Sequence, residues 1–271
     1  MRRSTRSGRE YGAGPPRPPS TNDTSVDPGG DRRGRRGRED GLTDTSPKLK
    51  PTPEAPPTPK QRPLLRGWIH CLAIPYTVYL AYRLVLCAPT IGSAYAAIVS
   101  CFCSGLGYAI SAYYHAVTHT PTWRAFVRKF DHAAIFSTIV GTYTPFIYRA
   151  YEYTGKSWLL GLLAADWLVA LVGMANSIGG LTPNLTKFQR AIMYIVVGWL
   201  PMPVAGEAFG WDVYRWNSMG GAVYTLGGLM YGLQWPNLLP GVFGYHEMFH
   251  VLIVIANTLM MKGLEHAFLT Y

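Results

Sequence analysis

Seven long apolar segments follow one another after residue 66, and they limit the possible folds more than any other feature of the chain. Each is close to the ~20 residues that a helix needs to cross the hydrocarbon core of a bilayer. Lipid offers the backbone no hydrogen bonds, so such segments must be helical. We therefore predict an all-α, polytopic membrane protein, a bundle of seven transmembrane helices at about residues 68–88, 93–115, 131–149, 157–176, 188–206, 218–235 and 244–265.

Charge divides the chain into two parts at residue 66. Residues 1–66 hold 12 of the 21 prolines, 15 of the 25 Lys and Arg, and 8 of the 15 Asp and Glu, and they contain no long apolar run. Such a composition cannot bury a core, so we expect a disordered Pro/Arg-rich tail. Residues 67–271 contain only 17 charged residues among 205, too few to solvate the surface of a soluble domain, and we assign them to the membrane domain.

The charges of the loops predict the orientation of the bundle. The tail and the basic loops at residues 124–129 and 187–190 fall on one side of the predicted membrane, whereas the opposite loops are nearly neutral. By the positive-inside rule, the N-terminus is cytoplasmic and the C-terminus lies outside. The tail has a net charge of +7, which beside a membrane favours anionic lipid, not nucleic acid, as its partner. Alternatively, it is a solvated tail that only fixes the orientation.

The same helix count places four metal-competent side chains at the cytoplasmic face. His115 ends the second predicted helix, and Asp131 begins the third. His246 and His250 begin the seventh, and residues four apart lie on one face of a helix. Neutral imidazole is a preferred ligand of Zn2+, and three protein ligands with a water are typical of catalytic zinc. We predict a zinc site formed by the three histidines; the alternative is histidines that only reach the polar interface.

Two further residues have predicted catalytic roles. Ser111 precedes His115 by one helical turn, so it would hydrogen-bond a metal-bound water or the substrate; otherwise it bonds its own helix. Asp131 would be a metal ligand, or would hold and deprotonate the water. A structural explanation of Asp131 is that an acid at a helix N-terminus suits the helix dipole.

Other polar residues of the predicted helices have weaker assignments. His70, near the start of the first helix, either supports the metal ligands from behind or is an interfacial residue. We expect His119 and His132 to lie outside the ligand set. Asp166 lies at mid-membrane depth, where a buried acid is a functional candidate, but no role is assigned to it.

A series of motifs occurs in order along the predicted helices: Arg66-Gly67-Trp68-Ile69-His70, Ser111-x3-His115, Trp123-Arg124, Asp131-His132, Gly141-Thr142-Tyr143-Thr144-Pro145 and Gly244-Tyr245-His246-Glu247-x-x-His250. Over about residues 62–266 this order resembles the hemolysin III family, which belongs to the progestin and adipoQ receptor (PAQR) superfamily. The resemblance implies a seven-helix bundle with a cytoplasmic N-terminus.

The resemblance also implies a site. It implies a zinc ion bound by His115, His246 and His250, an acid at Asp131 that contacts zinc through a water, and a serine close by at Ser111. Ceramidase-like hydrolysis of lipid amides has been proposed for relatives, and bacterial members are named for haemolysis. Receptors of the superfamily have an acidic residue and Asn ahead of a Thr-His pair in the first helix. Here no Glu precedes His70, which places the chain nearer the bacterial type.

Three functions are consistent with these residues. The first is a zinc-dependent hydrolase of lipid amides or esters, acting on a ceramide-like lipid. The second is a heptahelical receptor or a haemolysin-like channel protein with structural zinc. The third is an intramembrane metalloprotease, because His246-Glu247-x-x-His250 matches the zincin pattern, in which Glu247 would be the general base.

Overall fold

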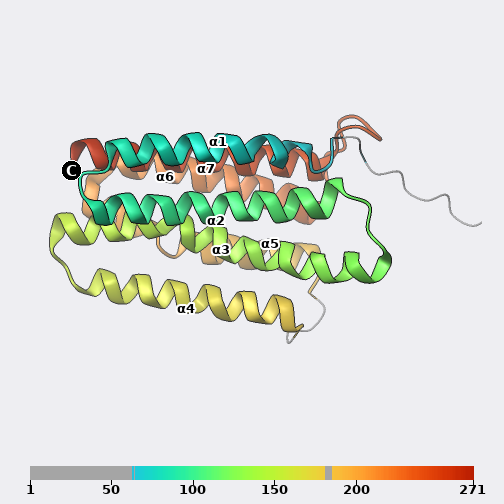
Figure 1. The fold of residues 1–271 in the computed structure, drawn as a ribbon, viewed down its shortest axis with the longest axis horizontal. Coiled ribbons are helices and arrows are strands. Elements are labelled where there is room, and N and C mark those ends of the chain that lie inside the picture. The colour runs from blue at the N-terminus through green and yellow to red at the C-terminus, as the bar shows by residue number, and fades with distance from the viewer. Residues whose placement is uncertain (1–62, 64, 181–184) are drawn as a thin grey trace, which may run out of the picture. The chain divides into compact units, whose positions relative to one another are not determined.

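A computed structural model of the chain describes residues 63, 65–180 and 185–271 (Figure 1). This part of the chain is helical and has no strand, apart from an isolated bridge between Leu239 and Phe243. The prediction of an all-α bundle is therefore confirmed. The helices within the described ranges are α1 (Trp68–Cys87), α2 (Ile91–Ala116), α3 (Pro121–Thr154), α4 (Trp158–Gly179), α5 (Lys187–Trp199), α6 (Met202–Leu233) and α7 (Tyr245–Thr270).

Most of the segment that we predict to be a disordered tail, residues 1–62 and 64, lies outside the described residues. Leu65, Arg66 and Gly67 form a turn that leads into α1. The turn is closed by a hydrogen bond of 3.2 Å from the backbone N–H of Trp68 to the carbonyl of Leu65. We call residues 65–67 the Arg66 turn.

The helix boundaries differ most from the predicted ones in two regions, the start of α3 and the junction of α5 and α6. α3 begins at Pro121, ten residues before its predicted start, because Thr120 caps it and proline fits the first helical position. The fifth predicted segment is divided: α5 ends at Trp199, ahead of Pro201, and α6 already begins at Met202. Gly210, with φ 70° and ψ −164°, breaks the helical backbone within α6, a conformation that glycine adopts at little cost.

Among the helices of the described residues, α1, α2, α4 and α7 are each long and apolar enough to cross a membrane. α5 and α6 meet the same criterion only as a pair, bent by 54°. α3 does not meet this criterion, and it lies inside the bundle, where it contacts α2, α4, α5, α6 and α7. Three of its threonines bond within the helix: Thr138, Thr142 and Thr144 each donate to the carbonyl four residues earlier. These helices are those of a multi-pass membrane bundle.

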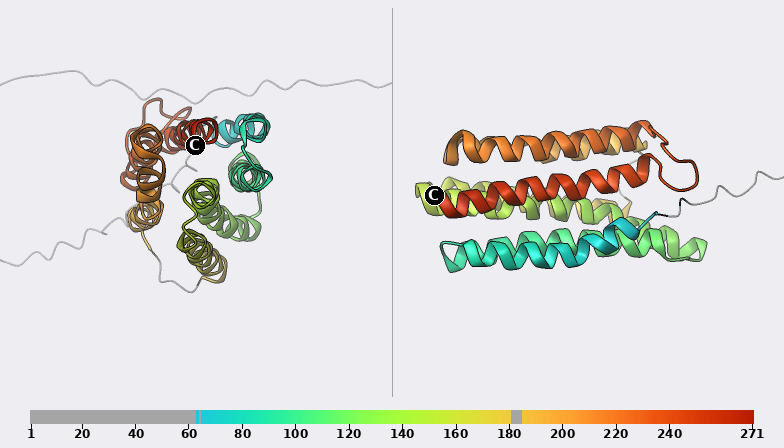
Figure 2. Two further views of the ribbon diagram at one scale, coloured as in Figure 1. Left: turned by 90° about the vertical axis from the view of Figure 1, so that its left-hand side faces the viewer. Right: turned by 90° about the horizontal axis from the view of Figure 1, so that it is seen from above.

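The helices run alongside one another, and α4 lies at the periphery against α3 (Figure 2). α2 and α3 approach closely at Gly141, where an added Cβ would lie 2.5 Å from the Cβ of Cys103. α1 packs on α2 and α7, and α7 packs on α6. This packing brings the end of α2 and the beginnings of α1, α3 and α7 to the same end of the bundle, which is the end predicted to be cytoplasmic.

Candidate metal centre

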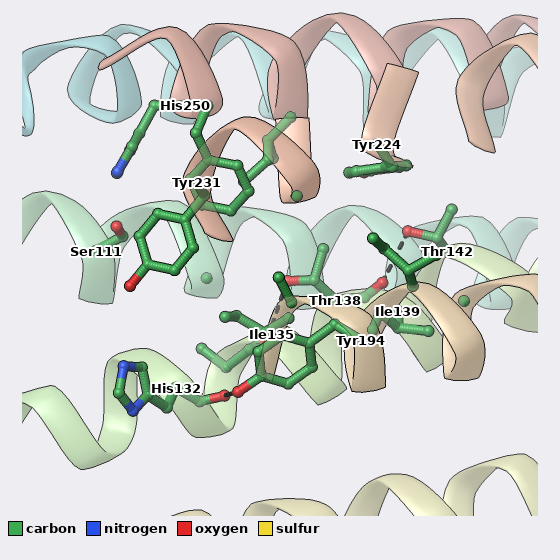
Figure 3. Close-up of a pocket in the computed structure, with 18 of the residues that line it drawn as sticks. Ser111, His132, Ile135, Thr138, Ile139, Thr142, Tyr194, Tyr224, Tyr231 and His250 are labelled. Atoms are coloured by element: carbon green, nitrogen blue, oxygen red, sulfur yellow. Dashed lines mark hydrogen bonds between the residues drawn. The ribbon is translucent and has the colours of Figure 1, made fainter. Parts of the chain in front are cut away.

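A cavity of about 170 Å³ lies within the bundle (Figure 3). Of the seven described helices, all except α4 contribute to its lining. On α3 the lining runs from Asp131 to Tyr143, about 18 Å along the axis at 1.5 Å per residue. The deeper part is mostly apolar or aromatic, with Ile139 and Met260 among its residues. The lining also includes nearly all of the polar residues considered from the sequence: His70, Ser111, His115, Asp131, His132, His246 and His250.

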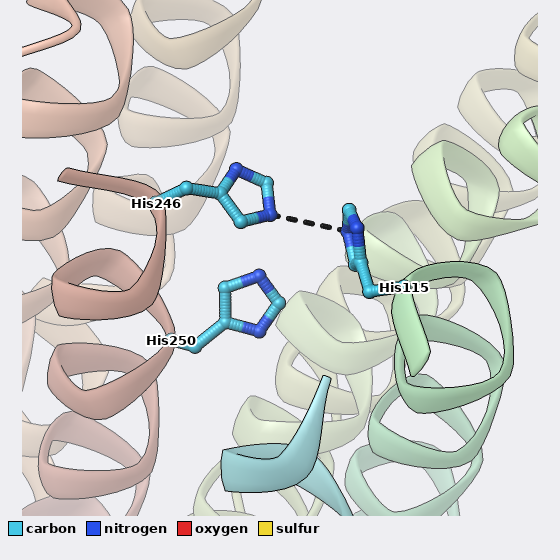
Figure 4. A group of neighbouring side chains, drawn as sticks. All are labelled: His115, His246 and His250. Carbon is cyan, nitrogen blue, oxygen red and sulfur yellow. Dashed lines mark hydrogen bonds between the residues drawn. The ribbon is translucent and has the colours of Figure 1, made fainter. Parts of the chain in front are cut away.

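Three histidines from two helices surround one point of this cavity (Figure 4). His115 lies in the last turn of α2, and His246 and His250 lie one turn apart at the start of α7. One ring nitrogen from each lies within 4.8 Å of the others, and the Nε2 atoms of His115 and His246 are 3.1 Å apart. Two nitrogens bound to one tetrahedral zinc ion at ~2.05 Å are separated by about 3.3 Å. The cluster therefore has the spacing of a metal site.

The donor set of this cluster fits zinc. His115 and His250 are buried and His246 is half-buried, so the three imidazoles face one another away from bulk water. Imidazole nitrogen is a preferred ligand of Zn2+, and the cluster contains no thiolate or carboxylate that would favour another ion. The three predicted ligands are thus brought together by the fold.

Asp131 and Ser111 lie beside the cluster. Both line the cavity, and the Ser111 hydroxyl lies near enough to the Asp131 carboxyl group to interact with it. Asp131 does not belong to the group of mutually close ligand atoms. Of the two roles that the sequence left open for Asp131, this position favours holding a water over direct ligation.

His70 contacts the cluster from α1. Its Nδ1 is 3.0 Å from the Nδ1 of His250, and the two ring centroids are 4.0 Å apart. The side chain is buried, with 4% of its surface exposed. A histidine that binds a metal through one ring nitrogen usually donates a hydrogen bond from the other nitrogen to a partner. His70 is placed to be that partner for His250.

The fold keeps three other candidates out of the ligand group. His119 lies between α2 and α3, where its Nε2 is 2.9 Å from the carbonyl of Tyr113. His132 lines the cavity without joining the three clustered histidines. Asp166 lies in α4, which contributes nothing to the cavity lining, so the structure gives this acid no part in the site.

Glu247 lies between the two histidines of α7, and both of its oxygens are engaged. Oε1 is 2.7 Å from Nε of Arg66, and Oε2 accepts a hydrogen bond of 2.9 Å from the backbone N–H of Gly244. None of the Glu247 side chain is exposed. A carboxylate held in this way is not available as the general base that the zincin pattern requires.

Part of the cavity wall was not predicted from the sequence. Tyr224, Gly228 and Tyr231 line it from α6. Their spacing of four and three residues puts them on one helix face. The available signal was the pair of tyrosines, Tyr224 and Tyr231, seven residues apart on this face of α6.

Comparison with known proteins gives one family match and two relatives. Residues 59–261 match the family model described as "Haemolysin-III related". Over 177 residues the chain is 30% identical to the Hemolysin-3 homolog of Bacillus subtilis (strain 168). The aligned region covers 59% of this chain and 73% of that protein. Over 178 residues it is 25% identical to the ADIPOR-like receptor IZH2 of Saccharomyces cerevisiae (strain ATCC 204508 / S288c). This aligned region covers 59% of this chain and 55% of the yeast protein. The match thus spans about half of the yeast relative.

Proposed function

The chain belongs to the haemolysin III family, within the PAQR superfamily, and from this premise we propose that it is a zinc-dependent hydrolase of lipid amides or esters. It is an integral, multi-pass membrane protein. The proposed substrate class is a ceramide-like lipid. The observation that carries the proposal is the three-histidine cluster at one part of a long apolar cavity.

His115, His246 and His250 would hold the zinc ion. Three protein ligands leave a position open, as in catalytic zinc sites, whereas structural sites are closed by four. Bound there, zinc would supply Lewis acidity and a water that is acidic enough to act as a nucleophile near neutral pH.

Asp131 would move the proton in the reaction. One of its carboxylate oxygens would take the proton of the attacking water and return it to the leaving nitrogen or oxygen, which is general acid–base catalysis. The nearby Ser111 hydroxyl would orient this carboxylate by donating a hydrogen bond to it. If that hydroxyl turned toward the substrate carbonyl, it would donate to the developing oxyanion.

The cavity would bind the hydrocarbon chain of the lipid. Its lining extends about 18 Å along α3 beyond Asp131, at 1.5 Å per residue, and includes Ile135 and Ile139. Each buried CH2 contributes about 0.8 kcal/mol, so this cavity favours a long acyl chain over a small polar amide.

A second candidate is a receptor or channel-like protein in which zinc is structural. The yeast relative is named a receptor, and this is the observation that favours it. In that case zinc would fasten α2 to α7 without turnover. The intramembrane protease is disfavoured because both oxygens of Glu247 are engaged.

The proposal is tested with the full chain purified in detergent. Bound zinc and release of fatty acid from ceramide-like amides and matched esters are measured for wild type and for Asp131→Asn. We expect Asp131→Asn to keep its zinc and to lose about 10²–10⁴-fold in turnover. Asp166→Asn is the matched control, because Asp166 is also an acid of a membrane helix but lies outside the cavity. Bound zinc with no turnover of any lipid would support the structural role, and full activity of Asp131→Asn would remove Asp131 from the mechanism.

A further inference from the structure

The Arg66 turn touches both helices that carry the clustered histidines. On one side Gly67 lies against Ala116, the residue after His115: an added Cβ at Gly67 would be 2.7 Å from the backbone nitrogen of Ala116. On the other side Arg66 forms an ion pair with Glu247, the residue after His246. The turn therefore sits between the end of α2 and the beginning of α7.

The ion pair between Arg66 and Glu247 is largely buried. The Glu247 side chain is fully buried and that of Arg66 is 23% exposed. Glu247 forms no other ion pair within the described part of the chain. A buried carboxylate that loses its cation keeps a large desolvation cost, so the position of Glu247 depends on Arg66.

Glu247 also holds the first turn of α7. Its second oxygen accepts the N–H of Gly244, the residue before the helix, so one carboxylate joins the helix start to the Arg66 turn. Helix starts fray when their free N–H groups lack partners. His246 and His250 lie in this part of the helix, and metal ligands must be held to within about 0.5 Å of their required places.

We propose that Arg66 and Glu247 are positioning residues that preorganise the three histidines for the metal. The pair fixes α7 against the turn, and the turn fixes the end of α2 through Gly67, so one segment holds both sides of the cluster. Glu247 of the His-Glu-x-x-His pattern would then orient the ligands without moving a proton. This inference rests on the metal centre proposed above.

A matched control lies at the other end of the bundle. Arg83 of α1 pairs with Glu265 of α7, so this ion pair also joins the α1 region to α7. Arg83 lies fifteen residues after Trp68, roughly 22 Å further along α1. Its loss should weaken the bundle without moving the histidines.

The experiment measures zinc affinity of the full chain in detergent, after removal of metal, by competition with a chromogenic chelator. We expect Arg66→Ala and Glu247→Gln each to weaken zinc binding about 10–100-fold, as loss of a residue that orients ligands does. The double variant should bind zinc as tightly as the single variant with the lower zinc affinity, because both changes remove the same ion pair. Arg83→Ala should bind zinc within about twofold of wild type, since it lies outside that interaction.

Folding is monitored separately by the melting temperature of each metal-free variant. The double variant leaves no unpaired buried charge, so it replaces Arg66→Ala in the comparison if Arg66→Ala fails to fold. Weakened zinc binding of the folded double variant then reports the loss of positioning alone. Wild-type affinity in the folded double variant, or an equal loss in Arg83→Ala, would overturn the inference while leaving the metal centre intact. A folded wild type that binds no zinc would overturn both.

Discussion

Replacing Gly67 with alanine should destabilise the protein by about 2–5 kcal/mol, although it adds a single methyl group. Gly67 has φ +90°, in the left-handed region, and a residue with a Cβ costs about 1–2 kcal/mol there. The new Cβ would also meet the nitrogen of Ala116 at 2.7 Å and its Cβ at 2.9 Å. Backbone atoms cannot turn aside as a flexible side chain can, and such overpacking costs about a further 1–3 kcal/mol.

The assay is reversible unfolding in mixed micelles, with wild type, Gly67→Ala and Gly161→Ala compared. Gly161 lies within α4 with nothing within 4 Å of an added Cβ, so alanine there should be neutral or stabilising by up to about 1 kcal/mol. Gly67→Ala should also weaken zinc binding, because it forces the Arg66 turn away from the residue that follows His115. Equal stability of Gly67→Ala and wild type would refute the close packing of the turn on α2.

Two further predictions concern the cavity. His70→Ala should weaken zinc binding about 10–100-fold without abolishing it, because His250 loses the partner of its second nitrogen; unchanged affinity in a metal titration would leave His70 with no supporting role. Ile139→Trp should lower kcat/KM for long-chain lipid amides by about fourfold for each methylene that it excludes, with short-chain amides and zinc content unaffected. Equal losses for short and long chains would contradict the assignment of the cavity to the acyl chain.

The helix ends that carry the site could be predicted from hydropathy and from the number of membrane spans between them. A helix that crosses the membrane returns the chain to the opposite side, so the number of spans decides which loops share a face. This is enough to bring His115 near His246 and His250, since the end of the second helix and the start of the seventh lie on one side. The spacing of the two histidines of α7 then orients both toward one point.

The remaining features depend on information that hydropathy does not contain. The first ten residues of α3 include three basic and three aromatic residues, so they form no long apolar run even though Thr120 caps them as a helix. The break within α6 depends on the backbone of one residue, Gly210. Arg66 and Glu247 are 181 residues apart, and no local pattern reveals which acid a given arginine will meet.

Metal content tests the central claim most directly. The full chain is purified in detergent, and zinc is quantified for wild type, His250→Ala and His119→Ala, the last because His119 lies outside the cluster. We predict about one zinc per chain in wild type and in His119→Ala, and little or none in His250→Ala, because two remaining imidazoles hold the ion weakly. A well-folded wild type without zinc, or unchanged zinc in His250→Ala, would contradict the assignment of these histidines as a metal centre.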